Sequence, residues 1–359
     1  MELDEGRPEE SDEEKVKAAR RILRFTSLNL QSFPALQILI FSSLFAISLW
    51  LMFHSFSLNR QDHLIGIGSK IWSDFAANLP LIRSFSFGDN WPPEYAIYPG
   101  RPIQYHFLFY AFVGSLERIG LPLDWALNLP SAFGFFLVLA MVYKIGEDLF
   151  SRGVGLLAVL FALCNGSLSF IQYFKKNGYQ GLRALFSTPD YTAMGPWDGG
   201  NVLGVWHLNV FLNQRHFCLA LGILFAFIWI CLRFESLSRR QKTVYAIVFG
   251  VSLGLMPQLH KPVLLMFAVT MGVYFIAASK MRKFLFTVGL ISLPFALAPT
   301  LMGLHLGIGA DRVARWSPGF HIDDLSFAGF AKLWFWNWGL HVFLIPIGFV
   351  LAPRKAKII

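Results

Sequence analysis

Charged residues are scarce in this sequence of 359 residues. Asp, Glu, Lys and Arg make up 15% of it, against about 25% in a typical soluble domain. The hydrophobic fraction is 55%, with a mean hydropathy of +0.51. This composition excludes an ordinary soluble domain and predicts an integral membrane protein. The 37 Phe and 11 Trp residues suit lipid-facing and interfacial positions.

Several chemical signatures are also missing. The three cysteines, Cys164, Cys218 and Cys231, lie in apolar segments without metal-ligand spacing, so we interpret them as small packing residues. We find no GxxxxGK[ST], no GxGxxG after a strand and no HExxH. No internal repeat stands out, and the two Gly/Pro-interrupted halves of many secondary transporters are not evident. The sequence therefore gives no indication of a nucleotide-binding fold.

The amino-terminal segment is not typical of a secretory signal peptide, because acidic residues dominate it and its apolar run starts late. We expect residues 1–24 to form a cytoplasmic tail and residues 25–359 a transmembrane domain. Within the tail, KVKAARRILRF is a short basic amphipathic helix suited to an anionic inner leaflet. The alternative is a helix that binds a partner protein.

Long apolar segments predict an all-α, polytopic transmembrane helical bundle of about eight spans. A bilayer core requires about 20 apolar residues per helix. The expected spans are Pro34–Phe53, Leu123–Tyr143, Val154–Ile171, Phe217–Leu232, Val244–Met256, Val263–Ala278, Phe284–Leu304 and Leu333–Leu351.

Basic residues near the span ends predict the orientation, since cytoplasmic loops carry an excess of Lys and Arg. With eight spans, every main basic cluster falls on one side, and both termini are cytoplasmic in a plasma (inner) membrane protein. The net charge of +9 lies in these short loops, so we expect no nucleic-acid partner. The clusters include Lys15, Arg20, Arg24, Lys144, Arg152, Arg233, Arg239, Arg240, Lys242, Lys280, Arg282, Lys283 and Arg354.

The opposite face then receives the first outer loop, 54–122, the second, 172–216, the turn Pro257–Pro262, and the last outer loop, 305–332. We expect the long first loop to carry juxtamembrane helices. Counting Gln104–Gly120 as a full span would break the charge pattern. It is therefore predicted to be an interfacial helix.

Asp74 is the first candidate site residue. It lies in WSDFAANLPLIRSF, where Ile71, Phe75, Leu79 and Ile82 have helical spacing. A carboxylate at the apolar edge of such a helix can serve as a general base or bind a metal. A helix cap or a solvated loop acid is the alternative.

Arg101, Tyr105 and His106 begin the interfacial helix in YPGRPIQYHF. A helix start with a nearby Arg and His suits a phosphate, although His106 could also cap or pack. Glu94 follows the turn sequence FGDNWPP, and either a substrate-binding or a turn role suits it.

Arg215 and His216 close the second outer loop in NQRHF. A guanidinium at that depth is costly unless it is paired or lines a wet cavity, so we predict a substrate-phosphate site, with snorkelling to the surface as the alternative. His260 and Lys261 occupy the turn PQLHKP. Lys261 could meet a lipid-linked phosphate or simply mark the interface.

The chain resembles the GT-C superfamily of polytopic glycosyltransferases, which includes protein O-mannosyltransferases and lipid A aminoarabinose transferases. The similarity covers about residues 34–172. It is carried by WSDFAANLPLIRSF, by YPGRPIQYHFLFYAF and by GLPLDWALNLPSAFGFFLVLAMVYKIGEDLFSRGVGLLAVLFAL.

The resemblance implies that Asp74 is the acid of the first outer loop, which activates the acceptor or helps to hold a divalent cation. The family's adjacent acid pair is missing, because Ser73 and Phe75 flank Asp74. A divalent cation is thus the one cofactor left open. Members tend to be longer, so the chain is interpreted as a fragment or a minimal form.

We therefore expect a membrane glycosyltransferase in which Asp74 and His106 are catalytic. The expected partners are a polyprenyl-phosphate-linked sugar, membrane lipids, and an acceptor lipid, glycan or protein. Arg101, His106, Arg215 and Lys261 are candidates for the donor phosphate on chemical grounds. The alternatives are a non-enzymatic lipid or solute transporter and a structural subunit of an envelope-synthesis complex.

Overall fold

The computed structural model describes residues 34–62, 64–68, 72–103, 106–187, 207–301, 324 and 326–352. Within these ranges the regular structure consists of α-helices, short 3-10 turns and two antiparallel hairpins, which confirms the all-α class. The elements are α2 (Pro34–Ser55), β1 (Phe56–Asn59), β2 (Leu64–Ile67), α3 (Trp72–Ser86), β3 (Glu94–Tyr95), β4 (Tyr98–Pro102), α4 (Leu108–Arg118), α5 (Leu123–Leu149), α6 (Arg152–Cys164), α7 (Ser169–Ser187), α8 (His207–Asn213), α9 (Arg215–Leu232), α10 (Arg239–Leu259), α11 (Lys261–Ala277), α12 (Arg282–Leu301), α13 (Phe327–Trp338) and α14 (His341–Leu351).

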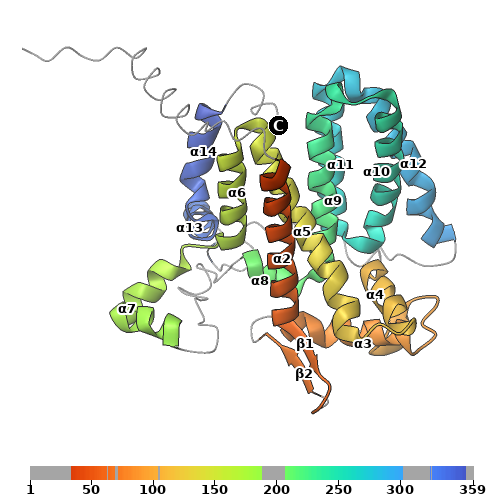
Figure 1. Cartoon of the computed structure of the whole chain (residues 1–359), viewed down its shortest axis with the longest axis horizontal. Helices are drawn as coiled ribbons and strands as arrows, with labels where there is room; N and C mark the ends of the chain where they lie inside the picture. The colour runs from red at the N-terminus through yellow and green to blue at the C-terminus, as the bar shows by residue number, and fades with distance from the viewer. Residues whose placement is uncertain are drawn as a thin grey trace, which may run out of the picture.

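Five described helical segments are long and apolar enough to cross a membrane, and six if the bent pair α13–α14 counts as one span. These segments coincide with α2, α5, α9, α10 and α12, the last including the short turn before it. They run alongside one another in Figure 1, together with the shorter α6 and α11. Their lengths follow from long apolar runs, since about 20 residues at 1.5 Å each match a bilayer core.

Each predicted span overlaps a helix, although α5 and α10 extend several residues beyond the predicted ends. Two further spans depart in length or shape. Helix α6 ends at Cys164, seven residues before the predicted Ile171. The predicted span Leu333–Leu351 is divided at Gly339, which has a φ of +60°, and α13 and α14 meet at 78°. Glycine adopts this left-handed backbone without steric cost, so the chain can turn there.

Helix α5 lies at the centre of the bundle, where it packs against α2, α6 and α9. Glycines allow the closest approach. A Cβ on Gly134 would lie 2.8 Å from the backbone nitrogen of Leu219, and one on Gly222 would lie 3.0 Å from the Leu137 side chain. Small residues let helices pack closely where the hydrophobic effect contributes little.

The segment predicted to be the first outer loop forms two hairpins and two helices. Strands β1 and β2 extend directly from α2, and β3 and β4 lie between α3 and α4. The buried face of α3, with Phe75 and Ile82, packs against protein, including α4. A helix within Gln104–Gly120 is confirmed as α4, but it begins at Leu108, so the prediction that Arg101 and His106 begin it is wrong: Arg101 lies in β4 and His106 precedes the helix. The interfacial location of α4 remains a prediction.

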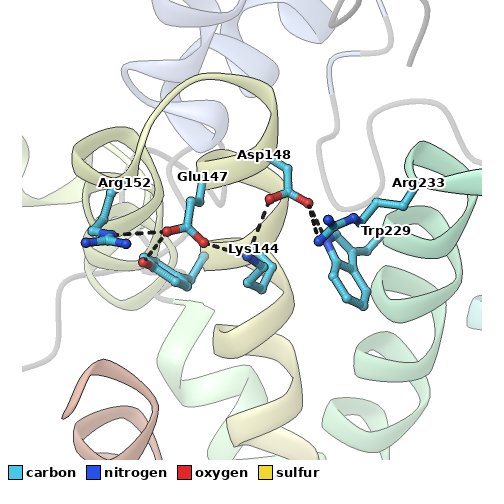
Figure 2. Close-up of polar contacts among 7 residues, drawn as sticks. Lys144, Glu147, Asp148, Arg152, Trp229 and Arg233 are labelled. Atoms are coloured by element: carbon cyan, nitrogen blue, oxygen red, sulfur yellow. Dashed lines mark hydrogen bonds and ion pairs between the residues drawn. The ribbon is translucent and has the colours of Figure 1, made fainter. Parts of the chain in front are cut away.

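A polar network closes the opposite end of the bundle, where α5 turns into α6 (Figure 2). The Glu147 carboxylate accepts hydrogen bonds from Tyr143 Oη, Lys144 Nζ and Arg152 Nε at 2.9, 2.6 and 3.1 Å. Asp148 accepts the Trp229 indole N–H at 2.9 Å and pairs with Arg233 at 3.5 Å. The network therefore joins α6 and α9 to the carboxyl end of α5.

The two ends of the bundle differ in character. The basic clusters from Lys144 to Lys283 lie in or beside the turns after α5, α9 and α11. These turns form one end of the bundle, which we call the basic end. The other end holds β1–β2, α3, α4 and α8 (Figure 1), and we call it the site end. Asn128 bonds Phe56 there, and Lys144 is about 24 Å further along α5 at 1.5 Å per residue.

Candidate functional site

Asp74 lies in the first turn of α3, at the site end, and is partly buried. Burial raises the pKa of its carboxyl group above the ordinary 3.8, and a hydrogen bond from the Asn213 side chain lowers it in part. Asn213 ends α8, and its Oδ1 is buried without a hydrogen-bond partner among the described residues. The raised pKa makes this carboxylate a stronger proton acceptor than an ordinary one, and the Asn213 amide holds it in place. Both properties suit a general base.

Arg215 is almost fully buried, with 1% of its surface exposed, at the start of α9. Its Nη1 donates to Asn128 Oδ1 at 2.9 Å, and its Nη2 to Ser55 Oγ at 2.9 Å. The guanidinium therefore ties α9 to α5 and to the end of α2.

The remaining guanidinium contacts are also to protein. Nε donates to the Leu212 carbonyl at 2.7 Å, Nη2 makes a longer bond of 3.4 Å to the Met52 carbonyl, and the guanidinium stacks 5.4 Å from the Phe75 ring. In this arrangement Arg215 positions the helices around Asp74 and His216. Direct contact with a donor phosphate would require it to exchange these bonds.

Three histidines converge beside this cluster. His106 precedes α4, His216 is the second residue of α9, and His260 lies between α10 and α11. The ring centroids are 4.2 Å apart for His106 and His216, 5.1 Å for His106 and His260, and 5.3 Å for His216 and His260. All three are buried, and one ligand atom from each lies within 4.8 Å of the others.

Neighbouring groups determine the hydrogen bonding and the protonation of these three imidazole rings. Tyr110 Oη is 2.7 Å from His216 Nδ1, and His260 Nδ1 accepts the Val263 N–H at 3.2 Å. Burial, followed by the charges of His260 and Lys261, lowers the pKa of His106 to about 3. Burial also lowers the pKa of His260 to about 4. His106 and His260 are therefore neutral near pH 7, and neutral imidazole is the form that binds metals.

The structure thus brings together six of the predicted residues. Asp74 is linked through Asn213 to the junction of α8 and α9, which carries Arg215 and His216. The rings of His106 and His260 lie next to that of His216. The charge of Lys261 acts on His106. These six residues are therefore close enough to belong to one site.

Three other predicted residues are not placed in this group. Glu94 is occupied within the β3–β4 hairpin, where its Oε2 accepts the Gly100 N–H at 2.7 Å. Arg101 is described only through its backbone in β4, and Tyr105 lies outside the described residues. Their roles remain predictions.

The sequence reasoning missed Asn128, Tyr110 and Gln258. Asn128 is fully buried in α5 and links Arg215 to the Phe56 carbonyl. The Gln258 amide is buried in the last turn of α10, with both polar atoms lacking a partner among the described residues. The available signal was an amide side chain within an otherwise apolar helix, where polar groups are costly and frequently functional.

At the level of class, the chain is therefore a helical bundle in which several helices are apolar enough to cross a membrane, with three buried imidazoles and a partly buried acid at one end. Comparison with protein-family models, with curated proteins and with solved structures found no match.

Proposed function

We propose that the protein is a membrane glycosyltransferase that transfers a sugar from a polyprenyl-phosphate donor to an acceptor hydroxyl at the outer membrane face. The observation that supports this is the gathering of Asp74, His106, His216, His260 and Lys261 at one end of the bundle. The described basic turns lie at the other end, so a cytoplasmic basic end would give the site access to the outer leaflet. The proposal includes eight spans in the plasma membrane and a cytoplasmic amino terminus.

The chemistry divides between the acid and the basic groups. The Asp74 carboxylate accepts the proton of the acceptor hydroxyl as its oxygen bonds to the anomeric carbon of the sugar. The bond from that carbon to the phosphate oxygen breaks, and polyprenyl phosphate leaves with the electron pair. The Lys261 cation and the neighbouring imidazoles stabilise the charge that develops on the phosphate.

Arg215 acts in this proposal as a positioning residue. It holds the start of α9, and with it His216, against α5 and the end of α2. Its partners in the hydrogen bonds described above are neutral oxygen atoms, so the guanidinium keeps its positive charge and adds a field that favours an anionic substrate. The apolar flanks of the bundle suit the polyprenyl chain.

A transporter is less well supported. That function expects polar groups near the middle of several spans. Arg215 and Lys261 are instead the first residues of α9 and α11, and His260 follows the last residue of α10. These residues therefore lie at helix ends.

The test is transfer of radiolabelled sugar from a polyprenyl-phosphate donor by the full chain in proteoliposomes. Because a general base contributes about 10²–10⁴-fold to rate, we expect Asp74→Asn to lose transfer by that factor. Asp89→Asn is the matched control, since Asp89 is an exposed acid in the same outer loop, and it should retain the wild-type rate. Full transfer by Asp74→Asn would remove Asp74 from the mechanism, and no transfer by wild type with any such donor would refute the function.

A further inference from the structure

The three-histidine cluster has the composition of a transition-metal site. His106, His216 and His260 come from three separate segments, and their exposed fractions are 9%, 1% and 5%. Imidazole suits zinc, copper, iron and nickel, whereas magnesium and calcium prefer oxygen ligands. We propose that these three residues bind a divalent transition-metal ion, with Zn²⁺ as the reference ion. Metal binding here does not depend on the sugar-transfer proposal.

The geometry is close to that of a bound site. Zinc binds histidine nitrogen at about 2.0–2.1 Å, and tetrahedral geometry then separates the ligand nitrogens by about 3.4 Å. The ligand atoms of the three residues lie within 4.8 Å of one another, so a closure of about 1.4 Å at the widest pair brings them to that separation. The rings are already adjacent, so rotation about their side-chain bonds can supply this movement without moving a helix.

Hydrogen bonds to the imidazole rings indicate which ring nitrogen is available to a metal. Metal-bound histidines usually hydrogen-bond through the other ring nitrogen, and the Tyr110 hydroxyl lies 2.7 Å from His216 Nδ1. His216 therefore has Nε2 for the metal. At His260, the Val263 N–H donates a long hydrogen bond of 3.2 Å to Nδ1. A metal can bind through Nδ1, which breaks this hydrogen bond, or through Nε2, which must first lose its proton.

Lys261 favours an anion as the fourth ligand. Three protein ligands leave a zinc ion with one open position, the arrangement of catalytic rather than structural zinc sites. Imidazole binds a metal as a neutral ligand, and the Lys261 cation acts on His106, so a bound dication increases the positive charge of the cluster. Hydroxide or a phosphate oxygen in the fourth position offsets that charge, and a metal here would thus act on an anionic substrate directly.

The test uses the full chain, purified in detergent, stripped with a chelator and dialysed against Zn²⁺. We expect elemental analysis to find one zinc per chain, and Co²⁺ in its place to give the visible absorption of a tetrahedral site. His106→Gln should weaken Zn²⁺ binding by more than 100-fold. Tyr110→Phe keeps the ring and loses the hydroxyl, and it should weaken binding about 10–100-fold, the usual effect of removing a hydrogen bond to a metal-bound histidine.

His54→Ala is the matched control, because His54 is exposed and stacks on Trp50 outside the cluster. It should bind zinc as wild type does. Each variant is first checked by size-exclusion chromatography, so that loss of fold is separated from loss of metal, and Tyr110→Phe provides a test if His106→Gln does not fold. Less than stoichiometric binding by folded wild type, or equal losses in His54→Ala and the cluster variants, would overturn the proposal. Since no sugar donor is present, neither result depends on transfer activity.

Discussion

At the scale of single residues, the surroundings of Asp74, including the Asn213 side chain, shift the pKa of its carboxyl group. Two effects on that carboxyl group oppose each other: burial favours the neutral form, and the Asn213 amide favours the charged form. Burial has the larger effect, so the pKa is raised above 3.8. If Asp74 is the base, the protein is inactive where this carboxyl group is protonated, and transfer appears as the pH rises through its pKa.

We therefore predict that Asn213→Ala moves the acid limb of the pH–rate profile to higher pH. The variant removes the hydrogen bond that favours the carboxylate while burial remains, so the pKa of Asp74 rises further. The measurement is sugar transfer from pH 3 to pH 8. An unchanged or acid-shifted limb would contradict the role of Asn213, and the limb should be absent in Asp74→Asn.

At the scale of elements, glycines determine how closely the helices approach. A Cβ on Gly254 of α10 would lie 2.5 Å from the Ser292 carbonyl oxygen and 2.6 Å from Phe295 Cβ on α12. Gly250, one turn earlier, is similarly close to Ile291. The α10–α12 contact therefore depends on backbone atoms that a larger residue would push apart.

We predict that Gly254→Val lowers the free energy of unfolding by about 1–3 kcal/mol, the usual cost of overpacking. Gly272→Val provides a matched control, because Gly272 is exposed on α11 and a Cβ there meets nothing within 4 Å. It should be neutral or slightly stabilising, since glycine is a poor helix former. Thermal unfolding in detergent measures both, and equal melting temperatures for the two variants would contradict the packing argument.

At the scale of the whole molecule, the separation of charge between the two ends predicts the orientation. The basic end carries Arg240 in an exposed position of α10, and the site end carries Gln61 in the exposed turn between β1 and β2. Gln61 follows β1, which lies at the site end in Figure 1, and Arg240 belongs to the basic clusters that define the basic end.

We predict that Gln61→Cys reacts with an impermeant maleimide in intact cells and that Arg240→Cys reacts only after permeabilisation. The background is Cys164→Ala, because Cys164 is exposed whereas Cys218 and Cys231 are buried. Labelling of both positions from the same side would contradict the bundle orientation and would also remove the outer-face transferase.

The helices could be predicted from sequence because the determining signals are local. An apolar run such as Pro34–Phe53 is long enough to cross a bilayer, and basic residues follow or precede such runs within a few positions. The position of a bend within an apolar run was harder to predict, because it depends on the backbone conformation of a single residue. Gly339 turns the last predicted span through 78°, although the hydrophobic pattern continues across it.

The sequence by itself determined that this is a helical protein with several long apolar segments, with basic residues near the short turns between them and Asp74 on a helix that follows the first of these segments. Only the tertiary structure decided which polar side chains meet. His106, His216 and His260 belong to segments far apart in the chain, and Arg215 is bound by Asn128 and Ser55. The physical reason is that such contacts depend on how helices pack, whereas helix formation depends on residues a turn or two apart.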